Sequence, residues 1–294
     1  MRHNPFQGTG LALVTPFAAD GSLDRAALVR LVNHSIDGGV DFLVVLGTTG
    51  ETATLATDEK KQVLETVAET TNGRIPLVVG VGGNNTAAVC AQLEAGLPSG
   101  YTGVLSVSPY YNKPTQEGIY QHYTAVCGST DAPVILYNVP GRTGSNVLAN
   151  TVLRVAQDCP NAVAMKEASG NLEQAMAIIQ SAPAGFDVLS GDDNLTLPLL
   201  ACGAKGVISV SGQAYPRLFS GMVRDARAGR LEDAQRAHYE LFTFTQLLFA
   251  EGNPGGIKAA LAHLGLCDNV LRLPLVPVSD ELNGKLRTLV AQLA

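Results

Sequence analysis

Tryptophan is absent from this 294-residue sequence, and phenylalanine and tyrosine bring the aromatic fraction to only 5%. Charged residues make up 16%, below the ~25% that is usual for soluble domains, so we expect part of the surface to lie in subunit contacts. The formal net charge is −6 and no block of like charges occurs. This composition argues against nucleic acid and anionic membranes as partners.

Long apolar runs and paired cysteines are also lacking. Runs such as FLVVLG, residues 42–47, are far shorter than the roughly 20 residues that cross a bilayer, and the first ten residues have no apolar signal core. Five cysteines are scattered without a CxxC pair, and an odd number is typical of reduced thiols. We therefore expect a soluble cytoplasmic protein.

What the sequence does contain is a series of short, β-branched apolar runs separated by segments of helical period. One such segment, residues 58–71, follows Thr57 as its expected cap. Continuous apolar runs indicate strands covered on both faces, as in a parallel sheet. Eight such units within about 220 residues predict an α/β protein with a closed (β/α)8 barrel. The expected strands are residues 11–17, 41–47, 75–82, 103–109, 133–140, 162–169, 187–192 and 206–212.

An open doubly wound sheet is the alternative, but it requires a nucleotide-binding loop after the first strand, and VTPFAADGS at 14–22 is not one. The remaining chain predicts only helices, at 230–250, 255–265 and 279–293, without a Pro/Ser-rich linker. We expect a catalytic barrel over 1–224 and a helical region over 225–294 that packs on it.

Lys166 ends the apolar run AVAMK, where a charge is costly. Barrel active sites lie at the carboxyl ends of the strands, and side chains alternate along a strand. Lys166 and Tyr137 are therefore expected to point into the barrel from neighbouring strands. Loss of hydration there favours the neutral amine, which attacks a ketone to form a Schiff base, and a tyrosine hydroxyl beside it carries protons.

The alternative for Lys166 is a structural ion pair with Glu167 or another carboxylate, and the residues alone leave both interpretations open. The other six lysines have simpler expected places. Lys60 and Lys61 are expected on a polar helix face, Lys113 in a proline-containing loop, and Lys205 at the amino end of the barrel, away from the active-site rim. Lys258 and Lys285 are expected in the C-terminal tail.

Three more motifs follow strands at the same rim. GTTGE, residues 47–51, offers hydroxyls and backbone N–H groups to a small anion, although an ordinary turn has the same pattern. PYYNKP, residues 109–114, carries paired tyrosines, for which loop packing is the alternative. YNVPGRT, residues 137–143, places Arg142 over the mouth as a clamp for a carboxylate, unless it is simply solvated.

Other candidate sites have weaker support. GVGGNN, residues 80–85, lacks the third glycine of a dinucleotide loop, and the five histidines never fall at ligand spacing. Asp192 and Asp193 carry oxygens suited to a cation, but polar contacts or helix capping are better explanations. We expect no metal and no pyridoxal phosphate, because a lysine iminium is itself an electron sink.

The ordered set GTTGE, PYYNKP, YNVPGRT, MKEASGN, SGDD and GVISV resembles the dihydrodipicolinate synthase family, within the pyruvate-dependent Schiff-base lyases and aldolases. The resemblance covers essentially the whole chain. The arginine of YNVPGRT favours this family over N-acetylneuraminate lyases and 2-keto-3-deoxygluconate aldolases. The resemblance implies condensation of pyruvate with L-aspartate 4-semialdehyde, on the route to diaminopimelate and lysine, by a homotetramer of tight dimers without an added cofactor.

The resemblance also implies a role for each matching residue. Lys166 would form the Schiff base, and a proton relay would contain Tyr137, Thr48 and Tyr111, the last reaching into the neighbouring subunit. The positions implied to bind substrate are Thr49 and Ile208 for pyruvate, Arg142 for the semialdehyde carboxylate, and Gly191. An aldolase acting on another aldehyde and a catalytically silent sensor are the remaining alternatives; Arg142 argues against the first, and the intact Lys166–Tyr137–Thr48 set against the second.

Lysine-inhibited members bind the end product in a cleft at the tight-dimer interface. The matching positions here are Thr52, Ala53, Thr57, Lys60, Asn84, Ala88 and Tyr110. Sensitive members commonly have histidine where Lys60 stands and glutamate where Ala88 stands. We therefore expect L-lysine to inhibit this protein weakly or not at all.

Overall fold

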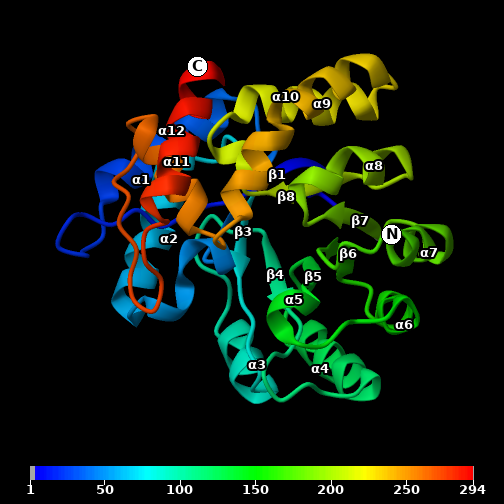
Figure 1. Ribbon diagram of the computed structural model, residues 1–294. Coiled ribbons are helices and arrows are strands. Elements are labelled where there is room, and N and C mark those ends of the chain that lie inside the picture. Colours follow the sequence, from blue (N-terminus) through cyan, green and yellow to red (C-terminus); the bar gives the residue numbers. More distant parts are fainter. Residues whose placement is uncertain (1–3, 294) are drawn as a thin grey trace.

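A closed barrel of eight parallel strands forms the centre of the molecule (Figure 1), as seen in a computed structural model that describes residues 4–293. The strands hydrogen-bond to one another in chain order, and β8 pairs with β1 to complete the barrel. The predicted α/β class and (β/α)8 architecture are confirmed. The strands are β1 Gly8–Ala12, β2 Phe42–Val45, β3 Leu77–Gly80, β4 Gly103–Val107, β5 Val134–Asn138, β6 Ala162–Glu167, β7 Asp187–Ser190 and β8 Gly206–Ser209.

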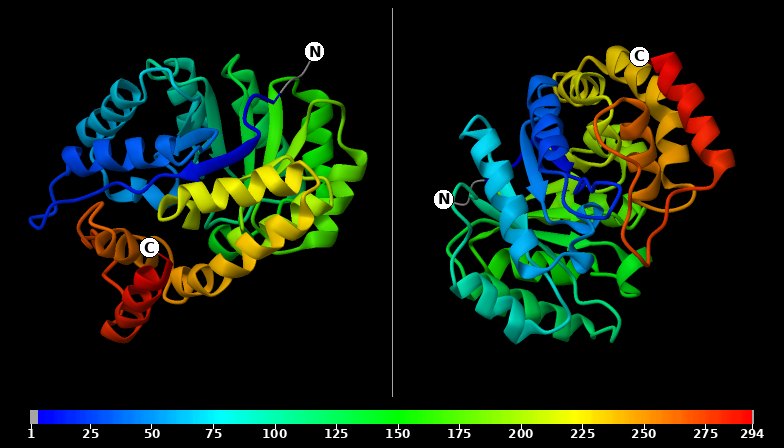
Figure 2. Two further views of the ribbon diagram at one scale, coloured as in Figure 1. Left: turned by 90° about the horizontal axis from the view of Figure 1, so that it is seen from above. Right: turned by 90° about the vertical axis from the view of Figure 1, so that its left-hand side faces the viewer.

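Helices follow each strand and cover the outside of the barrel (Figure 2). They are α1 Arg25–Asp37, α2 Thr57–Thr71, α3 Thr86–Glu94, α4 Gln116–Gly128, the single turn α5 Pro140–Thr143, α6 Ala149–Asp158, α7 Leu172–Ser181, α8 Thr196–Ala201 and α9 Pro216–Arg227. Short 3-10 turns lie at Thr48–Gly50 (η1), Thr52–Thr54 (η2), Asp193–Leu195 (η3) and Ser211–Gln213 (η4).

The three helices expected in the tail are present as α10 Leu231–Phe249, α11 Gly255–His263 and α12 Asp280–Leu293. Helix α10 packs along α9, and α12 packs against α10 and α11. Residue 225, where the helical region was expected to begin, lies inside α9, which runs to Arg227. The division of the chain at this residue stays a prediction. No helix within residues 4–293 has the length and apolarity that a membrane span requires.

Two local expectations were wrong. The first strand lies at Gly8–Ala12 rather than 11–17, because its first half contains glycines instead of apolar side chains. Gly10 leaves room for the Phe42 ring, since a Cβ there would lie 2.3 Å from it. Thr57 is the first residue of α2, and the N-cap is the residue before it, Ala56. The Glu59 carboxylate accepts a hydrogen bond from the Ala56 N–H at 2.9 Å.

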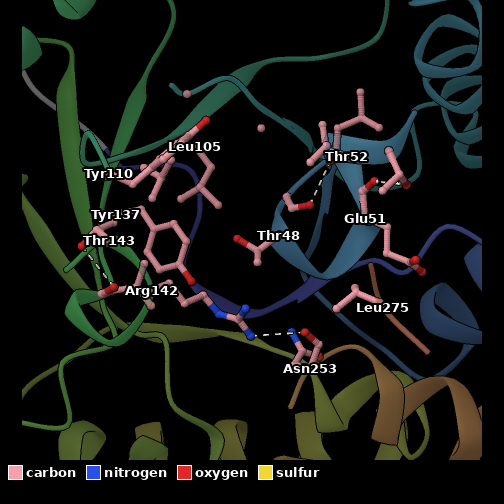
Figure 3. Close-up of a pocket in the computed structure, with 18 of the residues that line it drawn as sticks. Thr48, Glu51, Thr52, Leu105, Tyr110, Tyr137, Arg142, Thr143, Asn253 and Leu275 are labelled. Carbon is pink, nitrogen blue, oxygen red and sulfur yellow. Dashed lines mark hydrogen bonds between the residues drawn. The ribbon is translucent and has the colours of Figure 1, made fainter. Parts of the chain in front are cut away.

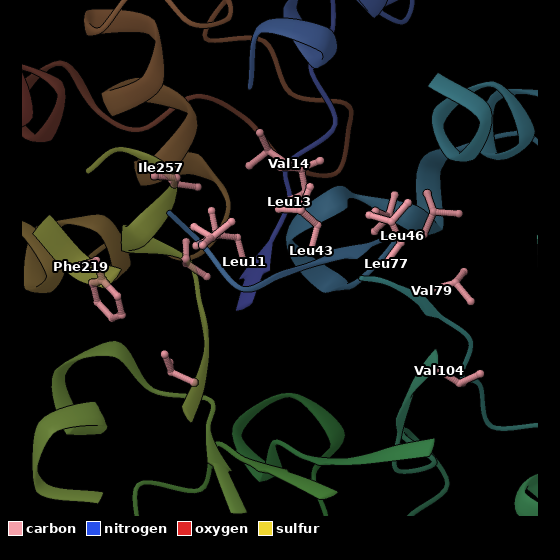
Figure 4. Close-up of a cluster of buried hydrophobic side chains, with 14 of the residues drawn as sticks. Leu11, Leu13, Val14, Leu43, Leu46, Leu77, Val79, Val104, Phe219 and Ile257 are labelled. Carbon is pink, nitrogen blue, oxygen red and sulfur yellow. The ribbon is translucent and has the colours of Figure 1, made fainter. Parts of the chain in front are cut away.

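The core has two layers because side chains alternate between the two faces of each strand. Leu43 and Val45 of β2 point outward to the helices, and Phe42 and Val44 point into the barrel. Figure 4 shows part of the outer layer, in which Ile257 of the C-terminal region lies among barrel residues. The inner layer closes the barrel below its carboxyl-end rim, so this rim is where a site with access to solvent can form.

Candidate active site

Tyr137 and Lys166 form one rung of the barrel. They are Cα partners on β5 and β6, and below them Ile135 pairs with Ala164. Tyr137 belongs to the inner layer, and the Lys166 Nζ lies 4.4 Å from the centroid of its ring. The exposed fractions of the two residues are 7% and 5%, so the amine is held against an aromatic face with little contact with water.

The ion pair considered as an alternative for Lys166 is not present. Glu167, the next residue, faces away from the barrel interior, where its carboxylate accepts from Asn138 Nδ2 at 3.1 Å, Ser169 N at 2.7 Å and Gln174 Nε2 at 2.9 Å. Within residues 4–293, Lys166 makes no salt bridge. Its side chain therefore has no acidic partner that would explain a purely structural role.

Gly191 lies against the same lysine. A Cβ on Gly191 would lie 3.0 Å from the Lys166 Cε and 2.7 Å from the Ala168 Cβ, so only glycine leaves this space to the lysine chain. The Gly191 N–H donates to the Glu167 carbonyl at 2.7 Å. Ile208 is part of the inner layer with 1% exposure. Gly191 thus adjoins Lys166, and Ile208 belongs to the same inner cluster as Tyr137.

The GTTGE turn follows β2 as two consecutive 3-10 turns. Its Gly50 and Glu51 N–H groups bond inside the turn, to the carbonyls of Gly47 and Thr48 at 3.1 and 3.2 Å. The turn is fastened to the barrel by Thr15, whose hydroxyl donates to the Gly50 carbonyl at 2.7 Å. With the Gly50 and Glu51 amides occupied, the hydroxyls and N–H groups of Thr48 and Thr49 are the polar groups of the turn that could meet a ligand.

A cavity of about 530 Å³ opens at this rim (Figure 3). It brings together Thr48, from the turn after β2, with Tyr137 of β5 and Arg142 of the turn that follows β5, and Tyr110 also lines it. Figure 3 shows the Thr48 and Tyr137 side chains directed into the cavity from opposite sides. The other predicted site residues, Lys166, Thr49, Tyr111, Ile208 and Gly191, are outside the lining.

Asn253, which the sequence did not single out, joins two of the predicted residues. Its carbonyl accepts from Arg142 Nη2 at 3.3 Å, and its Nδ2 donates to the Thr49 hydroxyl at 2.9 Å. It lies between α10 and α11 and lines the cavity, and its buried Oδ1 has no hydrogen-bond partner within residues 4–293. An asparagine in the turn-like segment EGNPGG carries no sequence signal for this role.

Tyr111 does not reach the cavity of its own chain. It is 87% exposed and has a left-handed backbone conformation, with φ of 74°, in the loop after β4. Its neighbour Tyr110 lines the cavity instead. Thus only one tyrosine of PYYNKP contributes within the single chain.

Within residues 4–293, neither the acidic motif nor the four described histidines form a metal centre. The Asp193 Oδ2 accepts from the N–H groups of Val210 and Ser211 at 3.0 and 2.8 Å, and burial raises the pKa of this carboxyl. His122 is buried, which lowers its pKa to about 4 and favours a neutral ring. In the described part of the chain, no cluster of three or more His, Cys, Asp or Glu side chains has metal-binding geometry.

Lys258 lies in the C-terminal tail, as expected, but in a place that the sequence did not predict. Its side chain is fully buried, and its Nζ is 2.5 Å from the Oε1 of Glu51, the last residue of the GTTGE turn. Burial lowers the pKa of this amine, and the Glu51 carboxylate opposes the shift. Lys258 lies within the apolar run GGIKAALA, just as Lys166 ends an apolar run. The same sequence signal could therefore have indicated a buried amine at Lys258.

The chain is similar to known proteins over nearly its whole length. The model of the dihydrodipicolinate synthetase family matches residues 5–293. The chain belongs to this family. A 4-hydroxy-tetrahydrodipicolinate synthase from Flavobacterium psychrophilum is 53% identical over 289 residues, covering 98% of this chain and 99% of that relative.

Solved structures of dihydrodipicolinate synthases agree. The enzyme from Thermotoga maritima superimposes with a TM-score of 0.96, at 41% identity over 99% of each chain. The enzyme from Acinetobacter baumannii, solved in complex with pyruvate, has a TM-score of 0.94 at 38% identity, covering 98% of this chain and 99% of that one. Membership of the family therefore extends over the barrel and the C-terminal helices.

Proposed function

We propose that this protein is a lyase that condenses pyruvate with L-aspartate 4-semialdehyde to give 4-hydroxy-tetrahydrodipicolinate, with Lys166 as the covalent catalyst. The observation that carries the proposal is the Tyr137–Lys166 rung beside the cavity, in a chain of the dihydrodipicolinate synthetase family. Its amine is buried and has no acidic partner within residues 4–293. A relative of the same fold binds pyruvate.

The reaction begins when the Lys166 amine attacks the ketone of pyruvate, and the carbonyl oxygen leaves as water. The iminium withdraws electrons, so the methyl group releases a proton and becomes an enamine carbon, which attacks the aldehyde. The amine of the semialdehyde then displaces Lys166, which closes the six-membered ring and frees the enzyme. Because the iminium is the electron sink, no added cofactor is required.

Protons move through hydroxyl groups. Tyr137 and Thr48 face the cavity from opposite sides, within the reach of a bound substrate. We assign the third member of the relay to the partner subunit's Tyr111, because this residue projects from its own chain. Thr49 and Ile208, with the space at Gly191, hold pyruvate against Lys166, and Arg142 binds the semialdehyde carboxylate at the mouth.

The use of Tyr111 from a neighbour requires at least a dimer, and we propose a homotetramer of tight dimers in the cytoplasm. The low charged fraction fits buried subunit contacts. Light scattering after size-exclusion chromatography measures the oligomer directly. A monomer that retains full activity would contradict this assignment of Tyr111.

The decisive experiment is reduction with borohydride in the presence of pyruvate, followed by peptide mass mapping. We expect one pyruvate-derived group per chain, on Lys166, and none in Lys166→Ala. Labelling of another lysine, or absence of labelling in active enzyme, would refute the mechanism. An aldehyde panel with pyruvate tests the alternative of a related aldolase, which would prefer an aldehyde without a carboxylate for Arg142.

A further inference from the structure

A second buried lysine lies behind the catalytic rim. Lys258 of α11 pairs with Glu51 at 2.5 Å, donates to the Val270 carbonyl at 2.8 Å and lies 4.1 Å from the centroid of the Phe17 ring. Both side chains of the pair have 0% exposure. The lysine has no access to the cavity and cannot meet a substrate, so its contribution must pass through Glu51.

Glu51 is the residue on which the GTTGE turn depends. It joins η1 to η2 with φ of 50°, a left-handed conformation that is unfavourable for a residue other than glycine. Its N–H donates to the Thr48 carbonyl, and its own carbonyl accepts from Thr54 N at 3.0 Å. Such a conformation persists only where the surroundings fix it.

The C-terminal region supplies that restraint at two points. Lys258 holds one carboxylate oxygen of Glu51, and the backbone N–H of Arg272 donates to the other at 3.0 Å. Replacement of a buried ion pair by apolar residues is often neutral for stability. The Lys258–Glu51 ion pair is therefore better explained by the orientation that it imposes on Glu51 than by a contribution to the stability of the fold.

We propose that Lys258 is a positioning residue of the active site. Through Glu51 it fixes the Thr48–Gly50 turn, so that the Thr48 hydroxyl faces the cavity and Thr49 is placed to hold pyruvate. The inference rests on the proposed function and extends it, since it makes the C-terminal helical region a working part of the pyruvate half of the site. Arg142, on a separate turn after β5, bonds to the Asn253 carbonyl and not to Glu51 or Lys258, so we expect it to be affected less.

The test uses Lys258→Met, Glu51→Gln and the double variant. We expect kcat to fall about tenfold or more and KM for pyruvate to rise, whereas KM for the semialdehyde stays within about twofold. Loss of folded enzyme would lower only the apparent kcat. The double variant leaves no unpaired buried charge, so it keeps the test valid where a single variant fails to fold. Because the pair acts as a unit, the loss of kcat in the double variant should be no larger than in either single variant.

Glu59→Gln is the matched control. It breaks the ion pair between Glu59 and the Arg272 side chain, 2.5 Å long, which joins the same C-terminal region to α2, and it leaves in place the bond from the Arg272 backbone N–H to Glu51. We expect this variant to lower the melting temperature and leave both KM values unchanged. Amide hydrogen exchange over residues 47–52 should accelerate in the double variant and not in Glu59→Gln.

The inference is wrong if the double variant keeps kcat and KM for pyruvate within about twofold of the wild type and exchange over 47–52 is unchanged. This outcome is separate from failure of the proposed function, which would appear as wild-type enzyme that does not trap pyruvate on Lys166. The exchange measurement needs no substrate, so it tests the restraint on the turn in either case.

Discussion

The Lys166 amine lies against the face of the Tyr137 ring, 4.4 Å from its centroid, while the same tyrosine lines the cavity. The two residues are directly opposed on adjacent strands, so the rigid barrel fixes their separation. The tyrosine thus contributes two separable features: a ring that packs on the lysine, and a hydroxyl on the side chain that lines the cavity.

Tyr137→Phe separates these features. We expect it to keep the fold and the cover over Lys166 but to lower turnover about 10²–10⁴-fold, because a group that transfers protons is lost. Borohydride should still label Lys166, more slowly. The control is Tyr120→Phe, which removes a surface hydroxyl bonded to Asp158 and should leave turnover unchanged. Turnover above half of the wild-type value in Tyr137→Phe would exclude the hydroxyl from the relay.

Arg142→Ala tests the clamp at the cavity mouth. Loss of a charge-assisted contact should cost roughly 1.5–3 kcal/mol, or ~10–100-fold in kcat/KM for the semialdehyde. Trapping of pyruvate on Lys166 should survive, since Arg142 acts on the second substrate. Arg154→Ala, at an exposed arginine paired with Glu117, should change neither quantity. An equal loss of trapping in Arg142→Ala would show that Arg142 does not serve the semialdehyde alone.

The ion pair of Glu59 with Arg272 makes part of the stability dependent on pH. Hydrogen bonds from the Arg272 guanidinium lower the pKa of Glu59 from 4.5 to about 2. Because the folded-state pKa is depressed, this stabilisation is complete above about pH 4.5 and is lost as the pH falls toward about 2. Urea unfolding at pH 7 should show Glu59→Gln less stable than the wild type by about 1–2 kcal/mol, allowing for the partial exposure of the pair. The difference should shrink at pH 3; an equal difference at both values would contradict the assignment.

Strand periodicity was sufficient to place Lys166 and Tyr137 together, because alternation along a strand and the register of a parallel barrel are local rules. It could not reveal Asn253 or Lys258, which meet the GTTGE turn across some 200 residues of sequence through packing of the C-terminal helices. The start of β1 was misplaced for a related reason: Gly10 belongs in the strand because the Phe42 ring needs its space, and this is a tertiary demand.

The last prediction concerns L-lysine. Lys60 and Tyr110 line the same cavity as Arg142, and Asn84 Nδ2 donates to the Tyr110 carbonyl at 3.4 Å. Ala88 is exposed and offers only a methyl group, so no carboxylate stands at this position to pair with the ammonium group of an amino acid. Lys60 adds positive charge near a ligand that is itself a cation. Absence of one charge-assisted contact weakens binding roughly 10–100-fold.

We therefore expect inhibition by L-lysine to be weak or absent at millimolar concentration. A double variant carrying Lys60→His and Ala88→Glu should become about 10–100-fold more sensitive, because it removes the repulsion and supplies the missing carboxylate. Ala87→Glu adds the same charge at the neighbouring exposed position of α3 and should have no effect. Titration of the condensation rate with L-lysine measures all three. Strong, saturable inhibition of the wild type below one millimolar would show that Lys60 and Ala88 do not weaken the site.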